Sequence, residues 1–141
     1  MAIVVDSPVW SLAYRRRQTD LNTDETSVVR ELQSLILGGQ AVLLGAVRQE
    51  VLSGLRSELQ FEELRMILRN FSDPEVRLED YEEAARLENI CRAAGFAATD
   101  VDMLICAIAS RMNAPVFTLD QDFVRYSRVL PFLLHPVAGR A

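Results

Sequence analysis

Three short runs of apolar, mostly β-branched residues constrain the fold of this chain most strongly. They lie at Ala2–Val5, Ala41–Leu44 and Pro115–Thr118, and the longer stretches between them carry the three-to-four-residue apolar spacing of helices. Strands that alternate with helices predict an α/β fold of three layers, with a mostly parallel central sheet and helices on both faces. Pro74–Leu78 and Phe132–Leu134 are candidates for further strands, so we expect four or five in all.

Local signals place the helices between these runs. Ser7 followed by Pro8 predicts an N-cap and a proline in the first helical turn. Glu50 falls on a helix expected from about Ala46 to Arg56, directly after the second strand. The chain has 141 residues and no repeat, linker or low-complexity tract, so we expect one domain over residues 1–141.

Four acidic residues stand where such a fold would gather them. Asp6 closes the first strand, and Asp120 follows the strand at Pro115–Thr118. The carboxyl ends of parallel strands meet at one edge of the sheet, and open α/β proteins bind their ligands there. Glu50 lies on the helix after the second strand, and Asp102 lies in the first turn of an apolar helix.

Each acid has an ordinary explanation when it is taken alone, as a helix cap, a turn residue or a solvated side chain. Together they are harder to explain, because carboxylates that crowd beside apolar segments repel and raise one another's pKa. A bound cation removes that cost, and oxygen donors without histidine or cysteine favour Mg²⁺ or Mn²⁺. We therefore predict a metal site made of Asp6, Glu50, Asp102 and Asp120.

Composition limits the function classes further. The formal net charge is −5, which argues against nucleic-acid binding, since phosphate contacts usually require a basic surface. All 15 basic residues are arginine, so a mechanism that needs a catalytic lysine is excluded. Cys91 and Cys106 lie in apolar helical patterns and are expected to be buried free thiols. No secretory signal or long apolar run is visible, so we expect a cytoplasmic protein.

The same acids lie in segments that resemble a known family. The segments are Val4-Val-Asp6-Ser-Pro-Val-Trp10, Glu50-Val-Leu-Ser-Gly54, Asp102-Met-Leu-Ile-Cys-Ala-Ile-Ala109 and Val116-Phe-Thr-Leu-Asp120-Gln-Asp-Phe123. In this order they resemble the PIN-domain ribonucleases, most closely the VapC type, which is the toxin of bacterial toxin–antitoxin pairs. The resemblance covers nearly the whole chain and implies a PIN-like fold. It also implies hydrolysis of RNA phosphodiester bonds by water activated with Mg²⁺ or Mn²⁺.

The resemblance implies roles for individual residues. Asp6 corresponds to a central metal ligand, and Glu50, Asp102 and Asp120 correspond to the remaining acids, with Glu50 expected to act through water. Whether Asp102 or Asp120 also serves as the base stays open. Asp100 competes with Asp102 for its role, but residues two apart on a helix point about 200° apart, and the apolar pattern favours Asp102.

Other residues are candidates for supporting roles. Three polar residues could orient the metal-binding acids through hydrogen bonds, namely Ser7, Thr118 and Asp122. An N-cap role for Ser7 and a surface position for Asp122 are the favoured alternatives. Candidate contacts to RNA phosphates are Arg15, Arg16, Arg17 and Arg48, against the simpler reading of solvated surface arginines. Two Mg²⁺ ions, at +2 each, would bring the net charge from −5 to −1.

The resemblance also implies partners. Proteins of this type commonly form homodimers and bind an antitoxin protein, and apolar surface around Trp10 and Phe61 is a candidate for that contact. The main alternative is a PIN-like scaffold that binds RNA or protein without cutting it. An aspartyl-phosphate phosphatase or receiver domain is disfavoured, because Pro8 stands where the phosphatase needs a second aspartate and receivers need a lysine.

Overall fold

The computed structural model describes residues 1–71 and 73–140. Its strands are β1 (Ile3–Val5), β2 (Ala41–Val42) and β3 (Val116–Phe117). Its helices are α1 (Ser7–Tyr14), α2 (Thr23–Leu37), α3 (Gly45–Leu52), α4 (Glu58–Leu68), α5 (Leu78–Ala93), α6 (Asp100–Met112) and α7 (Asp122–Tyr126), with a 3-10 turn at Gln18–Asp20.

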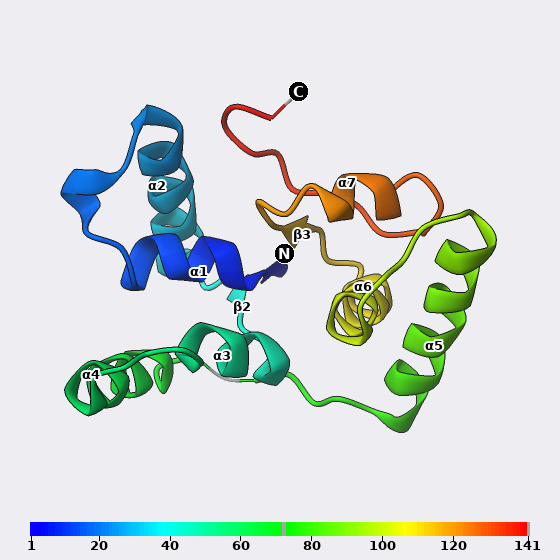
Figure 1. The fold of residues 1–141 in the computed structure, drawn as a ribbon, viewed down its shortest axis with the longest axis horizontal. Coiled ribbons are helices and arrows are strands. Elements are labelled where there is room, and N and C mark those ends of the chain that lie inside the picture. Colours follow the sequence, from blue (N-terminus) through cyan, green and yellow to red (C-terminus); the bar gives the residue numbers. More distant parts are fainter. Residues whose placement is uncertain (72, 141) are drawn as a thin grey trace.

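The three strands form a parallel sheet in the order β2-β1-β3. Ile3 pairs with Ala41, and Val4 pairs with Val116, so the carboxyl ends of all three strands lie at one edge. In Figure 1, α1 and α2 lie on one side of the strands, and α6, with α5 packed outside it, lies on the other. The predicted α/β class with a parallel sheet and helices on both faces is confirmed.

The core surrounds the central strand. All three residues of β1 are buried, since β1 has a strand on each side and helices over both faces. Cys91 and Cys106 are buried free thiols, as the sequence predicts. Trp10 is fully buried, and its indole N–H donates to the Val5 carbonyl at 3.0 Å, so the prediction of apolar surface at Trp10 is wrong.

The prediction of four or five strands is wrong, because the described residues form a sheet of three. No strand forms at Pro74–Leu78. Pro74 has no N–H to donate to a sheet. The backbone N–H of Arg77 donates instead to Asp80 Oδ2 at 2.8 Å, which starts α5 at Leu78.

The segment Phe132–Leu134 does run beside β3, but it forms only one parallel bridge, between Val116 and Leu134. The N–H of Val116 donates to the Leu133 carbonyl at 2.8 Å, and the N–H of His135 donates to the Val116 carbonyl at 2.9 Å. Pro136 follows and has no N–H, which explains why the pairing stops.

Two local features differ from the sequence prediction in ways that affect the site. Asp6, and not Ser7, is the N-cap of α1, which leaves the Ser7 hydroxyl free for another partner. The short helix α7 is not predicted by the sequence pattern at all. Among the described residues, no helix has the length and apolar character needed to cross a membrane.

Candidate metal centre

Asp6 lies where the central strand becomes a helix. Its extended backbone ends β1, and its Oδ1 accepts a hydrogen bond of 2.8 Å from the N–H of Ser7 in the first turn of α1. The side chain is almost fully enclosed, with 4% of the residue exposed. The strand-to-helix turn therefore holds this carboxylate in one place at the carboxyl edge of the sheet.

Thr118 joins the first and last strands at that edge. Its buried hydroxyl donates to Asp6 Oδ2 at 2.7 Å, and the same hydroxyl oxygen accepts from the N–H of Asp120 at 3.0 Å. One side chain thus orients the Asp6 carboxylate and fixes the backbone that carries Asp120. This geometry favours the supporting role that the sequence suggests for Thr118.

Ser7 links the first helix to Glu50. Its hydroxyl donates to Glu50 Oε2 at 3.0 Å, and Glu50 extends from α3 with its side chain largely exposed. Glu50 therefore lies beside the turn that carries Asp6.

Asp102 reaches the same region from the first turn of α6. Its N–H donates to the Thr99 hydroxyl at 3.1 Å, so Thr99 is the N-cap of α6. Its Oδ2 accepts a hydrogen bond of 2.9 Å from the hydroxyl of Tyr126, a residue of α7 that sequence reasoning missed.

The turn after β3 brings a further acid to the site. Asp120 Oδ1 accepts from the N–H of Asp122 at 2.9 Å, which begins α7. Carboxylate oxygens of Asp102, Asp120 and Asp122 lie within 4.8 Å of one another, so Asp122 stands next to the site although its side chain is 45% exposed, as its expected surface position predicts. The signal in the sequence was the pair of acids on either side of Gln121, directly before buried Phe123.

The electrostatics of the site favour a bound cation. Burial raises the pKa of Asp6 to about 6, and the nearby Asp102 and Glu50 add to the rise, against hydrogen bonds from Thr118 and Ser7. Burial also raises the pKa of Asp102, aided by Asp120 and Glu50 and opposed by hydrogen bonds from Tyr126 and Thr99. Hard oxygen donors that are held together against their repulsion fit Mg²⁺ or Mn²⁺.

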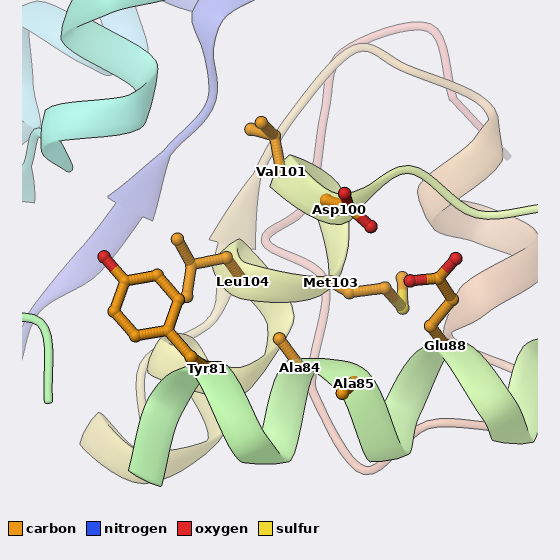
Figure 2. A pocket seen from close by; sticks show the side chains of 8 residues that line it. All are labelled: Tyr81, Ala84, Ala85, Glu88, Asp100, Val101, Met103 and Leu104. Atoms are coloured by element: carbon orange, nitrogen blue, oxygen red, sulfur yellow. The ribbon is translucent and has the colours of Figure 1, made fainter. Parts of the chain in front are cut away.

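Asp100 faces away from this site, as its position two residues before Asp102 predicts. It lies in a groove of about 360 Å³ between α5 and α6, together with Tyr81, Glu88 and Leu104 (Figure 2). The helical argument that separates Asp100 from Asp102 therefore agrees with the observed geometry.

The arginines expected to contact RNA mostly have other partners. Arg48 donates to the carbonyls of Leu68 and Phe71 at 2.8 and 2.7 Å and pairs with Asp73 at 2.9 Å. Its guanidinium therefore holds the chain after α4, and this geometry favours a structural role over a contact to RNA.

Of the three consecutive arginines, the first two also have partners. Arg15 donates to the Ser53 carbonyl at 3.0 Å, and Arg16 pairs loosely with Glu25 at 3.5 Å. Arg17 is exposed, with no side-chain hydrogen bond to the described residues. The structure instead places Arg125 and Arg128 beside Asp122, where they line a shallow hollow.

The fold and the site together define an α/β protein with an acidic, metal-compatible centre at the carboxyl edge of a parallel sheet. A family model described as the PIN domain matches residues 3–129. The chain therefore belongs to the PIN-domain family, which confirms the resemblance seen in the sequence. A comparison with curated proteins gave no match.

Solved structures show the same fold over nearly the whole chain. A chain of VapBC2 from Rickettsia felis, bound to a DNA fragment from the promoter, superposes with a TM-score of 0.73 at 15% identity, over 96% of this chain and 98% of that one. A chain of FitAcB from Neisseria gonorrhoeae gives 0.72 at 23% identity, over 92% and 96%. A chain of a toxin–antitoxin complex from Klebsiella pneumoniae gives 0.62 at 15% identity, over 85% and 88%.

Proposed function

We propose that this protein is a Mg²⁺- or Mn²⁺-dependent ribonuclease and the toxin of a type II toxin–antitoxin pair. The observation that carries the proposal is the convergence of Asp102, Asp120 and Asp122, beside Asp6 and Glu50, in a chain of the PIN-domain family. PIN domains are generally nucleases, and one of the similar solved structures is a toxin–antitoxin complex from Klebsiella pneumoniae.

In the proposed site, the acidic residues bind the ion and two hydroxyl groups orient them. Asp102, Asp120 and Asp122 supply oxygens within 4.8 Å of one another, whereas the buried Asp6 and the exposed Glu50 lie beside this group and outside it. Thr118 and Ser7 orient Asp6 and Glu50 through their hydroxyls. A divalent ion held there would polarise a phosphodiester and lower the pKa of water.

The test is cleavage of a structured RNA in the presence of Mn²⁺. We expect the wild type to cut and Asp120→Asn to lose most of that activity, because the amide removes one of the converging charges. Asp100→Asn is the matched control, since Asp100 carries the same side chain in a different groove. Cleavage by Asp120→Asn at the wild-type rate would show that Asp120 is not part of the catalytic site. Absence of cleavage by the wild type with any divalent ion would favour the non-cleaving scaffold.

For the RNA itself, we propose Arg17, Arg125 and Arg128 as contacts to backbone phosphates. Arg125 pairs with Asp122, and Arg128 lies one turn beyond it, so both stand next to the acidic cluster. Basic side chains there offset the negative charge that an approaching RNA meets. We expect Arg128→Ala to weaken RNA binding and to reduce its salt dependence, whereas Arg86→Ala on the far helix α5 should do neither.

For the protein partner, we propose that the antitoxin binds the groove between α1 and α4. The groove is lined by both apolar and polar side chains, namely Tyr14, Leu55, Leu64 and Ile67 with Arg15, Gln60 and Glu63. On the same helix, α4 exposes Leu59 and Met66 at 69% and 60% of their surface, and apolar side chains grouped beside a groove are a feature of protein–protein contact sites. Ile67→Asp should abolish co-purification with the product of an adjacent antitoxin gene, whereas Leu133→Asp, at another exposed apolar position, should not. The expected homodimer stays a prediction, for which sedimentation of the purified chain is the test.

A further inference from the structure

We propose that Tyr126 is a positioning residue of the metal centre, whose phenol holds the Asp102 carboxylate in the orientation that meets the other acids. This inference rests on the proposed metal site but concerns a residue outside the acidic set. The observation behind it is the hydrogen bond of 2.9 Å from the Tyr126 hydroxyl to Asp102 Oδ2, between α7 and the first turn of α6.

The phenol is itself held rigidly. Tyr126 is 1% exposed, and its ring packs edge-on against Phe123 with centroids 5.2 Å apart. Phe123 in turn packs edge-on against Phe132 with centroids 6.2 Å apart. A ring enclosed in this way cannot follow a moving carboxylate, so the carboxylate must adopt the position that the hydroxyl sets.

The position of Tyr126 on α7 explains why it reaches this site. Asp122 and Tyr126 are four residues apart in the same helix, so their side chains lie on one face, one turn apart. The helix therefore presents an acid and a hydrogen-bond donor to Asp102 together. One short element contributes one member of the acidic cluster and orients another.

The charges make such a donor necessary. Asp102, Asp120 and Asp122 place carboxylate oxygens within 4.8 Å of one another, and like charges at that distance drive the side chains apart. Asp102 is only half-buried, so another rotamer could take its carboxylate towards solvent. The Tyr126 phenol donates a charge-assisted hydrogen bond to the carboxylate and opposes that rotation.

A purely structural role makes a different prediction. A buried tyrosine usually satisfies its hydroxyl with some partner, and in that case its loss would lower stability alone. A positioning role requires a change in metal affinity as well. The two roles therefore separate in an experiment that measures metal binding without RNA.

The experiment compares Mn²⁺ binding by the wild type, Tyr126→Phe and Tyr81→Phe, using titration calorimetry on the whole chain. Tyr81→Phe is the matched control, because it removes the same hydroxyl from an exposed ring on α5, in the groove that faces away from the acidic cluster. Loss of an outer hydrogen bond to a ligand typically weakens metal binding by about 10–100-fold. We expect the dissociation constant of Tyr126→Phe to rise by about tenfold and that of Tyr81→Phe to stay unchanged.

Two results would overturn the inference in distinguishable ways. If the wild type binds Mn²⁺ and folded Tyr126→Phe binds it equally well, Tyr126 has no positioning role and the proposed metal site stands. If the wild type binds no Mn²⁺, the metal site itself is wrong and the inference falls with it.

A second measurement applies if Tyr126→Phe does not fold. The wild type can be labelled with 3-fluorotyrosine at its 3 tyrosines and titrated with Mg²⁺ while fluorine NMR is recorded. The resonance of Tyr126, assigned by elimination with Tyr14→Phe and Tyr81→Phe, should shift as the ion binds. A resonance that stays fixed through saturation would overturn the inference.

Discussion

Thr118 and Asp6, which are 112 positions apart in the sequence, share a buried hydrogen bond of 2.7 Å from the threonine hydroxyl to Asp6 Oδ2. Asp6 ends the central strand and Thr118 follows the neighbouring strand β3, so this contact exists only when the two strands pair in the observed register. The same hydroxyl accepts the N–H of Asp120. Stability of the sheet edge and geometry of the acidic site therefore depend on one small side chain.

Replacing that hydroxyl by a methyl group should destabilise the metal-free protein. Thr118→Val keeps the shape of the side chain but leaves Asp6 Oδ2 and the Asp120 N–H without their partner. An unsatisfied buried polar group costs about 1–3 kcal/mol, so we expect unfolding in urea with EDTA to require roughly 2 kcal/mol less. Thr118→Ser, which keeps the hydroxyl, should lose much less. Wild-type stability in the valine variant would contradict the structural role of this bond.

The raised pKa of Asp6 predicts a stability that depends on pH. Because the folded pKa is about 6 and the ordinary value is 3.8, the folded state binds the proton more tightly. Folding stability should therefore fall as pH rises from about 4 to 6, by roughly 3 kcal/mol at most, and the cost should persist at neutral pH.

The variant Asp6→Asn removes this charge. In EDTA it should melt at a higher temperature than the wild type at neutral pH, and the difference should shrink in acid, where Asp6 is protonated. A lower melting temperature for the Asp6→Asn variant at neutral pH would show that burial of the charge is not the dominant cost.

Divalent ions should stabilise the folded chain through the acidic cluster. At a free Mg²⁺ concentration about a hundred times the dissociation constant, binding to the folded state alone adds about 2.7 kcal/mol. Thermal unfolding with and without Mg²⁺ measures this gain, which should largely disappear in Asp102→Asn and remain in Asp100→Asn. An identical gain in both variants would place the ion elsewhere.

A separate ion pair holds α5 against α6. Asp80 is 2% exposed and accepts hydrogen bonds from Arg111 at 2.7 and 2.9 Å, and Arg111 also lowers the pKa of Asp80. Arg111→Met would leave a buried carboxylate unpaired, which typically costs about 3–5 kcal/mol, so we expect a loss of about 3 kcal/mol at neutral pH.

The sign of the pH dependence follows from the lowered pKa. The contribution of this pair is present above the ordinary pKa of 3.8 and is lost as pH falls below it, so the variant and the wild type should converge in acid. Arg86→Met, which breaks an exposed pair with Glu83, should change stability little. An equally small effect at Arg111 would contradict the importance of the buried pair.

The sequence predicted the larger features because they depend on local periodicity. The strand regions, most of the helices and the four acids at the sheet edge follow from apolar runs and the residues that end them. The predicted boundaries of the elements were less accurate. Pro74–Leu78 leads into α5 because the N–H of Arg77 donates to the Asp80 carboxylate, and Asp6 is the N-cap of α1 in place of Ser7. The sequence predicted an exposed Arg48, since no local pattern indicates that its guanidinium donates to the carbonyls of Leu68 and Phe71.

What the sequence determined by itself is the class of the protein, because the order of strands, helices and acidic residues along the chain is typical of that class. The tertiary structure alone decided which oxygens meet. Asp122 joined Asp102 and Asp120 through a five-residue helix too short for periodicity to reveal, and Tyr126 met Asp102 across 24 positions. Contacts of this kind depend on rotamers and on packing between elements, whereas periodicity records only which face of each element is buried.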